Sequence, residues 1–219
     1  MTEPTPGRRV KTRWIAALSA LAFVGLAPAV PSAMALAPEP APVPRRWQLE
    51  VETSALRMTV VNLPDGPRAV LFMTYKVTNN STSDLLFAPS FELATDDMAV
   101  LRSGRDVSVA VTNTLLDRLE SPMIQDQISI VGNLLRGEEN AKEGLVVWPV
   151  PSLFQNELTV YCSGFSGETA TMDIPNPATG KVERKVLRKT LELRYRLPGE
   201  LVPAAGGEYV PYSSRWIMR

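Results

Sequence analysis

From residue 47 onward, apolar and polar residues alternate along much of the chain. A period of two is typical of β-strands that bury one face and expose the other. The clearest run lies at residues 69–78, and shorter runs occur at residues 47–51, 56–60, 87–93, 128–130 and 158–162. Short, wholly apolar runs at residues 98–101 and 145–148 are also expected to be strands. The pattern predicts a chain built mainly of β-strands.

The phase of the alternation reverses near Thr53 and Ser54. Apolar residues occupy odd positions in residues 47–51 and even positions in residues 56–60. Such a reversal indicates either a β-bulge or a crossing of the chain from one sheet to another.

The longest alternating run spans residues 186–197. Its apolar positions are expected to face a core, and they are Leu187, Leu191, Leu193, Tyr195 and Leu197. Its polar positions are expected to face solvent, and they are Arg188, Thr190, Glu192, Arg194 and Arg196.

One segment has the period of a helix. Residues Val107, Val111, Leu115 and Leu119 fall four apart, as on one face of an α-helix. Asp106 is expected to cap the helix, and Pro122 follows its end. Short strands separated by turns, with one inserted helix near residues 106–120, predict an all-β antiparallel β-sandwich.

The N-terminus has the pattern of an export signal. Basic residues at 8–13 precede an apolar run at 14–27 and small-x-small cleavage sites that end at Ala35 and Ala37. Pro28 and Pro31 interrupt the apolar run before it reaches the roughly 20 residues that a membrane-spanning helix needs. We expect residues 1–37 to be a signal peptide, with no membrane span in the mature form and a secreted or periplasmic location. An uncleaved N-terminal anchor is the alternative.

The remaining chain divides by composition. Residues 38–46 are a proline-rich linker, residues 47–198 are the β-sandwich domain with its helical insert, and residues 199–219 are a C-terminal tail. Removal of residues 1–37 takes away four of 23 basic and one of 23 acidic residues, which leaves 19 against 22, or about −3. A mildly acidic chain is a poor electrostatic match for nucleic acid.

The inventory of reactive side chains is small. The chain has no histidine, so triads with a histidine base and zinc sites with imidazole ligands are excluded. The single cysteine, Cys162, cannot form an intrachain disulfide, and its strand position predicts a buried thiol. The acidic residues Glu138, Glu139 and Glu143, with Asn140, match no calcium loop and are expected in a solvated turn. We therefore predict no catalytic residue, no metal ligand and no cofactor.

The densest charge feature is a basic cluster on the longest strand. The candidate interaction surface comprises Arg184, Lys185, Arg188, Arg194 and Arg196, with Tyr212 and Trp216 of the tail as aromatic contacts. Such a surface suits an acidic partner or an anionic envelope surface. The alternative is a charged face that protects a long strand from edge pairing.

Several motifs resemble those of known exported domains. The run at residues 75–81 (Tyr-Lys-Val-Thr-Asn-Asn-Ser) resembles a strand of exported bacterial immunoglobulin-like domains, and residues 135–138 and 144–151 are similar to a later part of that pattern. Residues 87–93 and 137–141 resemble a group of uncharacterised secreted proteins of planctomycete-type bacteria. The resemblance implies an exported immunoglobulin-like β-sandwich domain and supplies no catalytic residue.

These observations favour an exported, non-enzymatic binding or interaction module of the bacterial cell envelope. Its partner would be an envelope protein or polymer of unknown identity. Two alternatives remain: an enzyme that acts on a glycan through paired carboxylates, and a protein that binds a small cation or metal.

Overall fold

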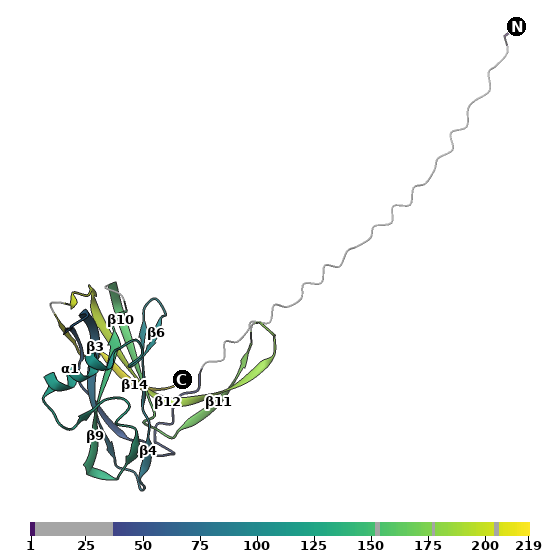
Figure 1. Ribbon diagram of the computed structural model, residues 1–219. Coiled ribbons are helices and arrows are strands. Elements are labelled where there is room, and N and C mark those ends of the chain that lie inside the picture. Colours follow the sequence, from purple (N-terminus) through teal and green to yellow (C-terminus); the bar gives the residue numbers. More distant parts are fainter. Residues whose placement is uncertain (3–36, 152–153, 177, 204–205) are drawn as a thin grey trace. The chain divides into compact units, whose positions relative to one another are not determined.

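Two six-stranded sheets and one two-stranded sheet make up most of the computed structural model (Figure 1). The structure describes residues 1–2, 37–151, 154–176, 178–203 and 206–219. Strand pairing in the described residues is antiparallel except between β7 and β9. The predicted all-β sandwich with one helix is confirmed.

The first sheet has the strand order β13-β2-β3-β9-β7, and β1 also pairs with β3. Its strands are β1 (Glu50–Thr53), β2 (Leu56–Leu63), β3 (Gly66–Asn79), β7 (Ile124–Gln125), β9 (Gly137–Pro149) and β13 (Gly207–Tyr209).

The second sheet has the order β11-β12-β10-β5-β6, and β14 also pairs with β12. Its strands are β5 (Ser90–Thr95), β6 (Val100–Arg102), β10 (Phe154–Ser163), β11 (Thr169–Pro175), β12 (Val182–Glu200) and β14 (Ser213–Met218). The small sheet pairs β4 (Leu85–Phe87) with β8 (Gly132–Leu134).

The phase reversal seen in the sequence is a β-bulge within the first sheet. Both β1 and β2 pair with β3, and the register shifts by one residue between them. At the bulge, the Ser54 amide donates to the Thr74 carbonyl at 2.9 Å, and the Ser54 hydroxyl accepts from the Thr74 amide at 3.0 Å. The extra residue moves the apolar positions of β2 back onto the buried face.

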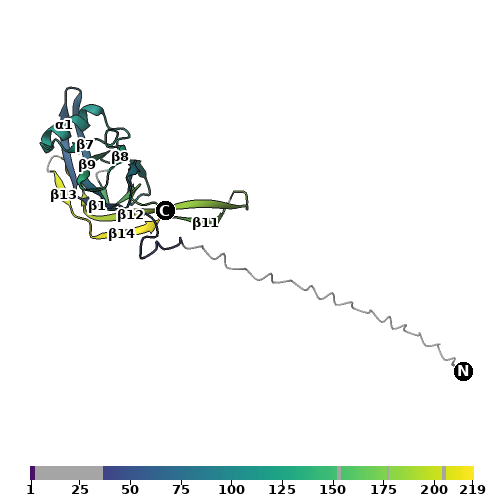
Figure 2. The same cartoon turned by 90° about the horizontal axis from the view of Figure 1, so that it is seen from below.

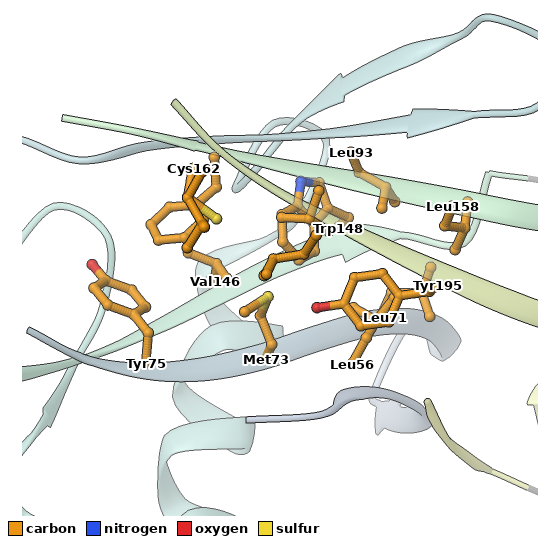
Figure 3. Packing of buried hydrophobic residues seen from close by; sticks show 14 of the residues in the cluster. Leu56, Leu71, Met73, Tyr75, Leu93, Val146, Trp148, Leu158, Cys162 and Tyr195 are labelled. Atoms are coloured by element: carbon orange, nitrogen blue, oxygen red, sulfur yellow. The ribbon is translucent and has the colours of Figure 1, made fainter. Parts of the chain in front are cut away.

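The main core lies between the inner faces of the two six-stranded sheets. Figure 3 shows Trp148 and Met73 from the first sheet close to Leu93, Leu158 and Tyr195 from the second. These side chains are buried, as the alternating pattern of their strands predicts. The core fixes which face of each strand of the second sheet is turned to solvent.

A second, smaller core lies under the helix. The α-helix α1 (Val109–Leu119) packs Val111 and Leu115 against Phe72 and Val147 on the outer face of the first sheet. The predicted cap, Asp106, is wrong: the N-cap is Ser108, whose hydroxyl accepts from the Val111 amide at 3.4 Å. Asp106 precedes the helix in a left-handed conformation with φ of 60°, so its backbone turns the chain before the cap.

Two further local predictions from the sequence are wrong. Residues 128–130 form a turn, because the Asp126 carboxylate accepts from the amides of Ile128 and Ser129. The apolar alternation there reflects a buried Ile130 next to an exposed Ile128. Glu138, Glu139, Asn140 and Glu143 lie on β9 instead of in a turn.

The C-terminal tail and the proline-rich segment both contact the sandwich. The tail contributes β13 to the first sheet and β14 to the second. In the proline-rich segment, the Ala41 amide donates to Glu168 at 2.8 Å. The predicted export signal falls almost wholly in residues 3–36, outside the described residues. No helix in the described part of the chain has the length and apolarity to cross a membrane.

Candidate functional site

A row of charged and aromatic side chains crosses the outer face of the second sheet. In strand register, Arg215 of β14 lies opposite Glu192 of β12, which lies opposite Tyr161 of β10. Tyr161 in turn lies opposite Glu92 of β5, and Glu92 lies opposite Arg102 of β6. Residues directly opposite in paired strands share a face, so five strands place these side chains in one line.

The alternation of β12 explains why this row faces outward. Leu191, Leu193 and Tyr195 point into the main core, so the residues between them take the opposite face. Glu192 and Arg194 therefore lie on the outer face of the sheet, as the sequence predicts. The predicted exposure to solvent is wrong for Thr190 and Glu192, which are each 3% exposed; the guanidinium groups of Arg194 and Arg215 contact the Glu192 carboxylate.

Glu192 is the centre of the row. Its side chain is 3% exposed and is held by Arg215 Nε at 2.6 Å and Arg194 Nε at 3.2 Å. Burial by itself raises the pKa of Glu192, but the hydrogen bonds from the two guanidinium groups outweigh it, and the net pKa lies below its usual value. The carboxylate thus fixes two guanidinium groups above the sheet.

Glu92 plays the same role at the other end of the row. It pairs with Arg102 at 3.5 Å and accepts a hydrogen bond from Arg219. The guanidinium carbon of Arg219 lies 4.0 Å from the centre of the Tyr161 ring, in cation–π geometry, and the same guanidinium group bonds to Glu92. The aromatic ring and the carboxylate together fix the position of this third arginine.

Arg196 extends the same face. Its guanidinium carbon lies 5.1 Å from the centre of the Tyr212 ring, and the Tyr212 hydroxyl donates to Glu157 of β10. We call this surface the arginine face; its cations are Arg102, Arg194, Arg196, Arg215 and Arg219. Five arginines against the three carboxylates of Glu92, Glu157 and Glu192 leave an excess of two positive charges.

A hollow of about 530 Å³ lies at the β6 edge of the arginine face. Its polar lining comprises Glu92, Arg102, Arg105 and Asp106. The hollow therefore extends the pattern of alternating cations and carboxylates beyond the last strand.

The structure divides the surface that the sequence predicted. Arg194, Arg196 and Tyr212 come together on the arginine face. Trp216 does not join them, because its side chain packs against the main core. Its strand neighbour on β12 is the buried Leu191, so it shares the inner face.

The other predicted cations lie on a hairpin formed by β11 and the first part of β12. There Arg184 Nε pairs with Asp173 at 3.0 Å, and Lys185 pairs with Glu183 at 2.9 Å. Arg184 and Lys185 therefore form a second surface on this hairpin. Arg188 exchanges backbone hydrogen bonds with Arg219, at the point where the hairpin meets the sandwich.

Sequence reasoning missed Arg102, Arg215 and Arg219. Arg215 lies on β14 and Arg219 follows that strand, so their places beside Glu192 and Glu92 depend on long-range pairing with β12. Arg102 lies opposite Glu92 in the β5–β6 pair, and its place on this face depends on the register of that pair. The alternation of residues 213–218 was the one local signal, since it marks a strand with Arg215 and Trp216 on opposite faces.

Other candidate chemistry lies away from this face. Cys162 is buried, and burial raises the pKa of its thiol far above the usual value, which disfavours a reactive thiolate. Within the residues that the structure describes, no three histidine, cysteine, aspartate or glutamate side chains gather as a metal site would require.

Comparison with known proteins finds no matching family model, no matching curated protein and no matching solved structure.

Proposed function

We propose that this chain is an exported, non-enzymatic binding module of the bacterial cell envelope, and that its arginine face holds a carboxylate-bearing partner. The observation that carries the proposal is the set of guanidinium groups held by the buried Glu192 and the half-buried Glu92 on one sheet face. The partner is a protein or polymer of the envelope.

The chemistry of arginine supports an anionic partner. A guanidinium group presents several donors in a planar fork that matches a carboxylate, and it stays charged at any physiological pH. Arg102 and Arg215 keep 71% and 57% of their side chains exposed although each pairs with a carboxylate below it. Donors therefore remain free to reach a ligand.

The fixed positions of these side chains favour binding. A surface arginine normally loses side-chain freedom when it binds, which reduces the affinity. Here Glu192 and Glu92 already hold four of the five guanidinium groups. Part of that entropy is thus lost on folding, before the partner arrives.

The shape of the surface favours an extended partner. A row that crosses five strands presents charges at regular intervals over the width of the sheet. An acidic polymer or an acidic protein surface can contact several of these positions at once. The export pattern of residues 1–37 and the resemblance to exported immunoglobulin-like domains support an envelope location.

A titration with poly-L-glutamate tests the proposal. The test variant is Arg102→Gln/Arg196→Gln, and the control is Arg68→Gln/Arg118→Gln, which removes the same charge from the region of β2, β3 and α1. We expect the test variant to bind about 5- to 30-fold more weakly, from about 0.5–1 kcal/mol per exposed contact. Equal losses in the two variants, or no binding by the natural protein at low salt, would contradict the proposal.

A further inference from the structure

The hairpin of β11 and the first part of β12 projects away from the sandwich in both views (Figures 1 and 2). We call it the arm; it comprises β11, its turn and residues 182–188 of β12, with pairs from Thr169↔Arg188 to Pro175↔Val182. Beyond Arg188, β12 is flanked by β10 on one side and β14 on the other. In the arm, β11 is the only strand paired with β12 among the described residues.

The direction of the backbone groups follows from two hydrogen-bonded contacts. The Lys189 amide donates to the Glu168 carbonyl, so Lys189 points toward the β11 side. Arg188 and Arg219 exchange both of their amide–carbonyl hydrogen bonds, so Arg188 points toward the β14 side. Because the direction alternates along a strand, Val182, Arg184 and Val186 point to the same side as Arg188. On that side β14 ends, and the edge of β12 continues without a paired strand in the described part of the chain.

The two edges of the arm differ in a way that matters for strand pairing. On β11 the outward residues include Asp173 and Pro175, and proline has no amide hydrogen to donate. This edge is blocked in the usual manner of exposed strands. The edge of β12 has no proline from Val182 to Arg188, so each outward residue retains both a donor and an acceptor.

The side chains at this edge favour a particular partner. Val182 and Val186 are 67% and 62% exposed, and Arg184 lies between them on the same face. The arm as a whole carries Lys181, Arg184, Lys185 and Arg188 against Asp173 and Glu183, an excess of two positive charges. A strand laid along the edge would thus gain apolar contact with the valines and ion pairs with the cations.

A second copy of the chain fits this edge poorly. The antiparallel register that pairs the three outward residues Val182, Arg184 and Val186 with those of a second copy would place Arg184 opposite Arg184 at the two-fold axis. A shift by one residue pair in either direction would place Lys185 opposite Lys185 or Glu183 opposite Glu183. Like charges directly opposite each other destabilise a strand pair.

We propose that the β12 edge of the arm, at Val182, Arg184 and Val186, binds an extended segment of a partner protein as an added β-strand. The segment alternates apolar and acidic residues. It continues the line of β14 and converts a two-stranded arm into a three-stranded sheet. Two-stranded hairpins are marginally stable alone, so the added strand also stabilises the arm.

The probe is a fluorescein-labelled octapeptide that alternates valine and aspartate, titrated into the full chain by fluorescence anisotropy. We expect it to bind, and a valine–lysine octapeptide to fail. Amide hydrogen exchange at Val182, Arg184 and Val186 should slow when the acidic peptide is bound, because those amides gain acceptors. Binding of both peptides alike, or unchanged exchange at these amides, would overturn the proposal.

Proline substitutions on the two edges provide a matched test. Val186→Pro removes an outward amide of β12, and Thr171→Pro removes an outward amide of the directly opposite residue on β11. We expect Val186→Pro to weaken the peptide about tenfold or more, equal to about 1.4 kcal/mol, and Thr171→Pro to leave its affinity within about twofold. Equal effects of the two substitutions would overturn the proposal.

Two further variants distinguish the β12 edge from the arginine face and from self-association. Val186→Asp keeps the backbone donor but places a like charge against the acidic peptide, so it should also weaken binding if the proline variant fails to fold. In the Arg102→Gln/Arg196→Gln variant, the acidic peptide should still slow amide exchange at Val182, Arg184 and Val186, because those amides belong to the arm and not to the arginine face. Loss of that slowing in the variant would assign the peptide to the arginine face, and dimers in sedimentation of the natural chain would assign the edge to a second copy. Either result would overturn the proposal.

Discussion

At the scale of single residues, Glu192 is expected to affect stability most, because its buried carboxylate holds Arg215 and Arg194. Its folded pKa lies below the usual 4.5, so its stabilising effect is complete above that pH and is lost as the pH falls through the folded pKa. We predict that Glu192→Gln lowers the free energy of unfolding at pH 7 by about 1–3 kcal/mol. Urea unfolding from pH 7 to 3 measures it. The difference in free energy of unfolding between the variant and the natural protein should become smaller as the pH falls. A difference that grows as the pH falls would contradict the assignment.

Gly144 is a second residue with a specific physical role. It lies directly opposite Tyr75 in the β3–β9 pair, and a Cβ atom there would lie 2.4 Å from Cζ of the tyrosine ring. Tyr75 is buried and packs on Phe91 at 4.7 Å, so the ring cannot move aside freely. We predict that Gly144→Ala destabilises the fold by about 1–3 kcal/mol. Thermal unfolding of Gly144→Ala in a Tyr75→Ala background is the control, where the penalty should largely vanish.

At the scale of elements, the proline-rich segment is attached to the sandwich by a buried ion pair. Lys189 Nζ and Glu168 lie 3.0 Å apart with exposed side-chain fractions of 3% and 14%, and both bond to the backbone of Ala41. The hydrogen bond from the Ala41 amide, followed by that from Lys189, holds the pKa of Glu168 below its usual value. The prediction of a proline-rich linker at residues 38–46 did not include this contact.

Removing one partner of this pair should release the segment. We predict that Glu168→Ala costs about 3–5 kcal/mol, since it leaves the ammonium group of Lys189 buried without its anion. Hydrogen exchange at the Ala41 amide should accelerate in the same variant. Adding Lys189→Met should restore most of the stability but not the protection of Ala41. If Ala41 stays protected in Glu168→Ala, the ion pair does not hold the segment.

Local pattern predicted elements better than it predicted their partners. The alternation at Leu71, Met73 and Tyr75 identified the buried face of β3, because period two is a property of the strand itself. The same alternation wrongly predicted a strand at residues 128–130. The apolar spacing there is that of a strand, but the Asp126 carboxylate accepts a hydrogen bond from the Ile128 amide and forms a turn. The sequence did not distinguish Ser108 from Asp106 as the N-cap, because both side chains can accept a hydrogen bond from the first turn of a helix and they lie two positions apart.

At the scale of the whole molecule, the arginine face could not be derived from the sequence. Arg194 and Arg196 were identified because they lie on one strand, but Arg102 and Arg219 reach them only through sheet order and register. A register slip of one residue would send these side chains to the core side. The whole chain has no net formal charge, yet one sheet face carries an excess of arginine. The order and register of the strands bring these arginines together.

The central claim is that the arginine face is the binding surface. The most direct test follows the side-chain Nε–H signals of the arginines by nuclear magnetic resonance as poly-L-glutamate is added to the full chain. The account predicts shifts for Arg102, Arg194, Arg196, Arg215 and Arg219, with Arg68 and Arg118 unmoved. Shifts confined to Arg68 and Arg118, or equal small shifts of every arginine, would contradict it.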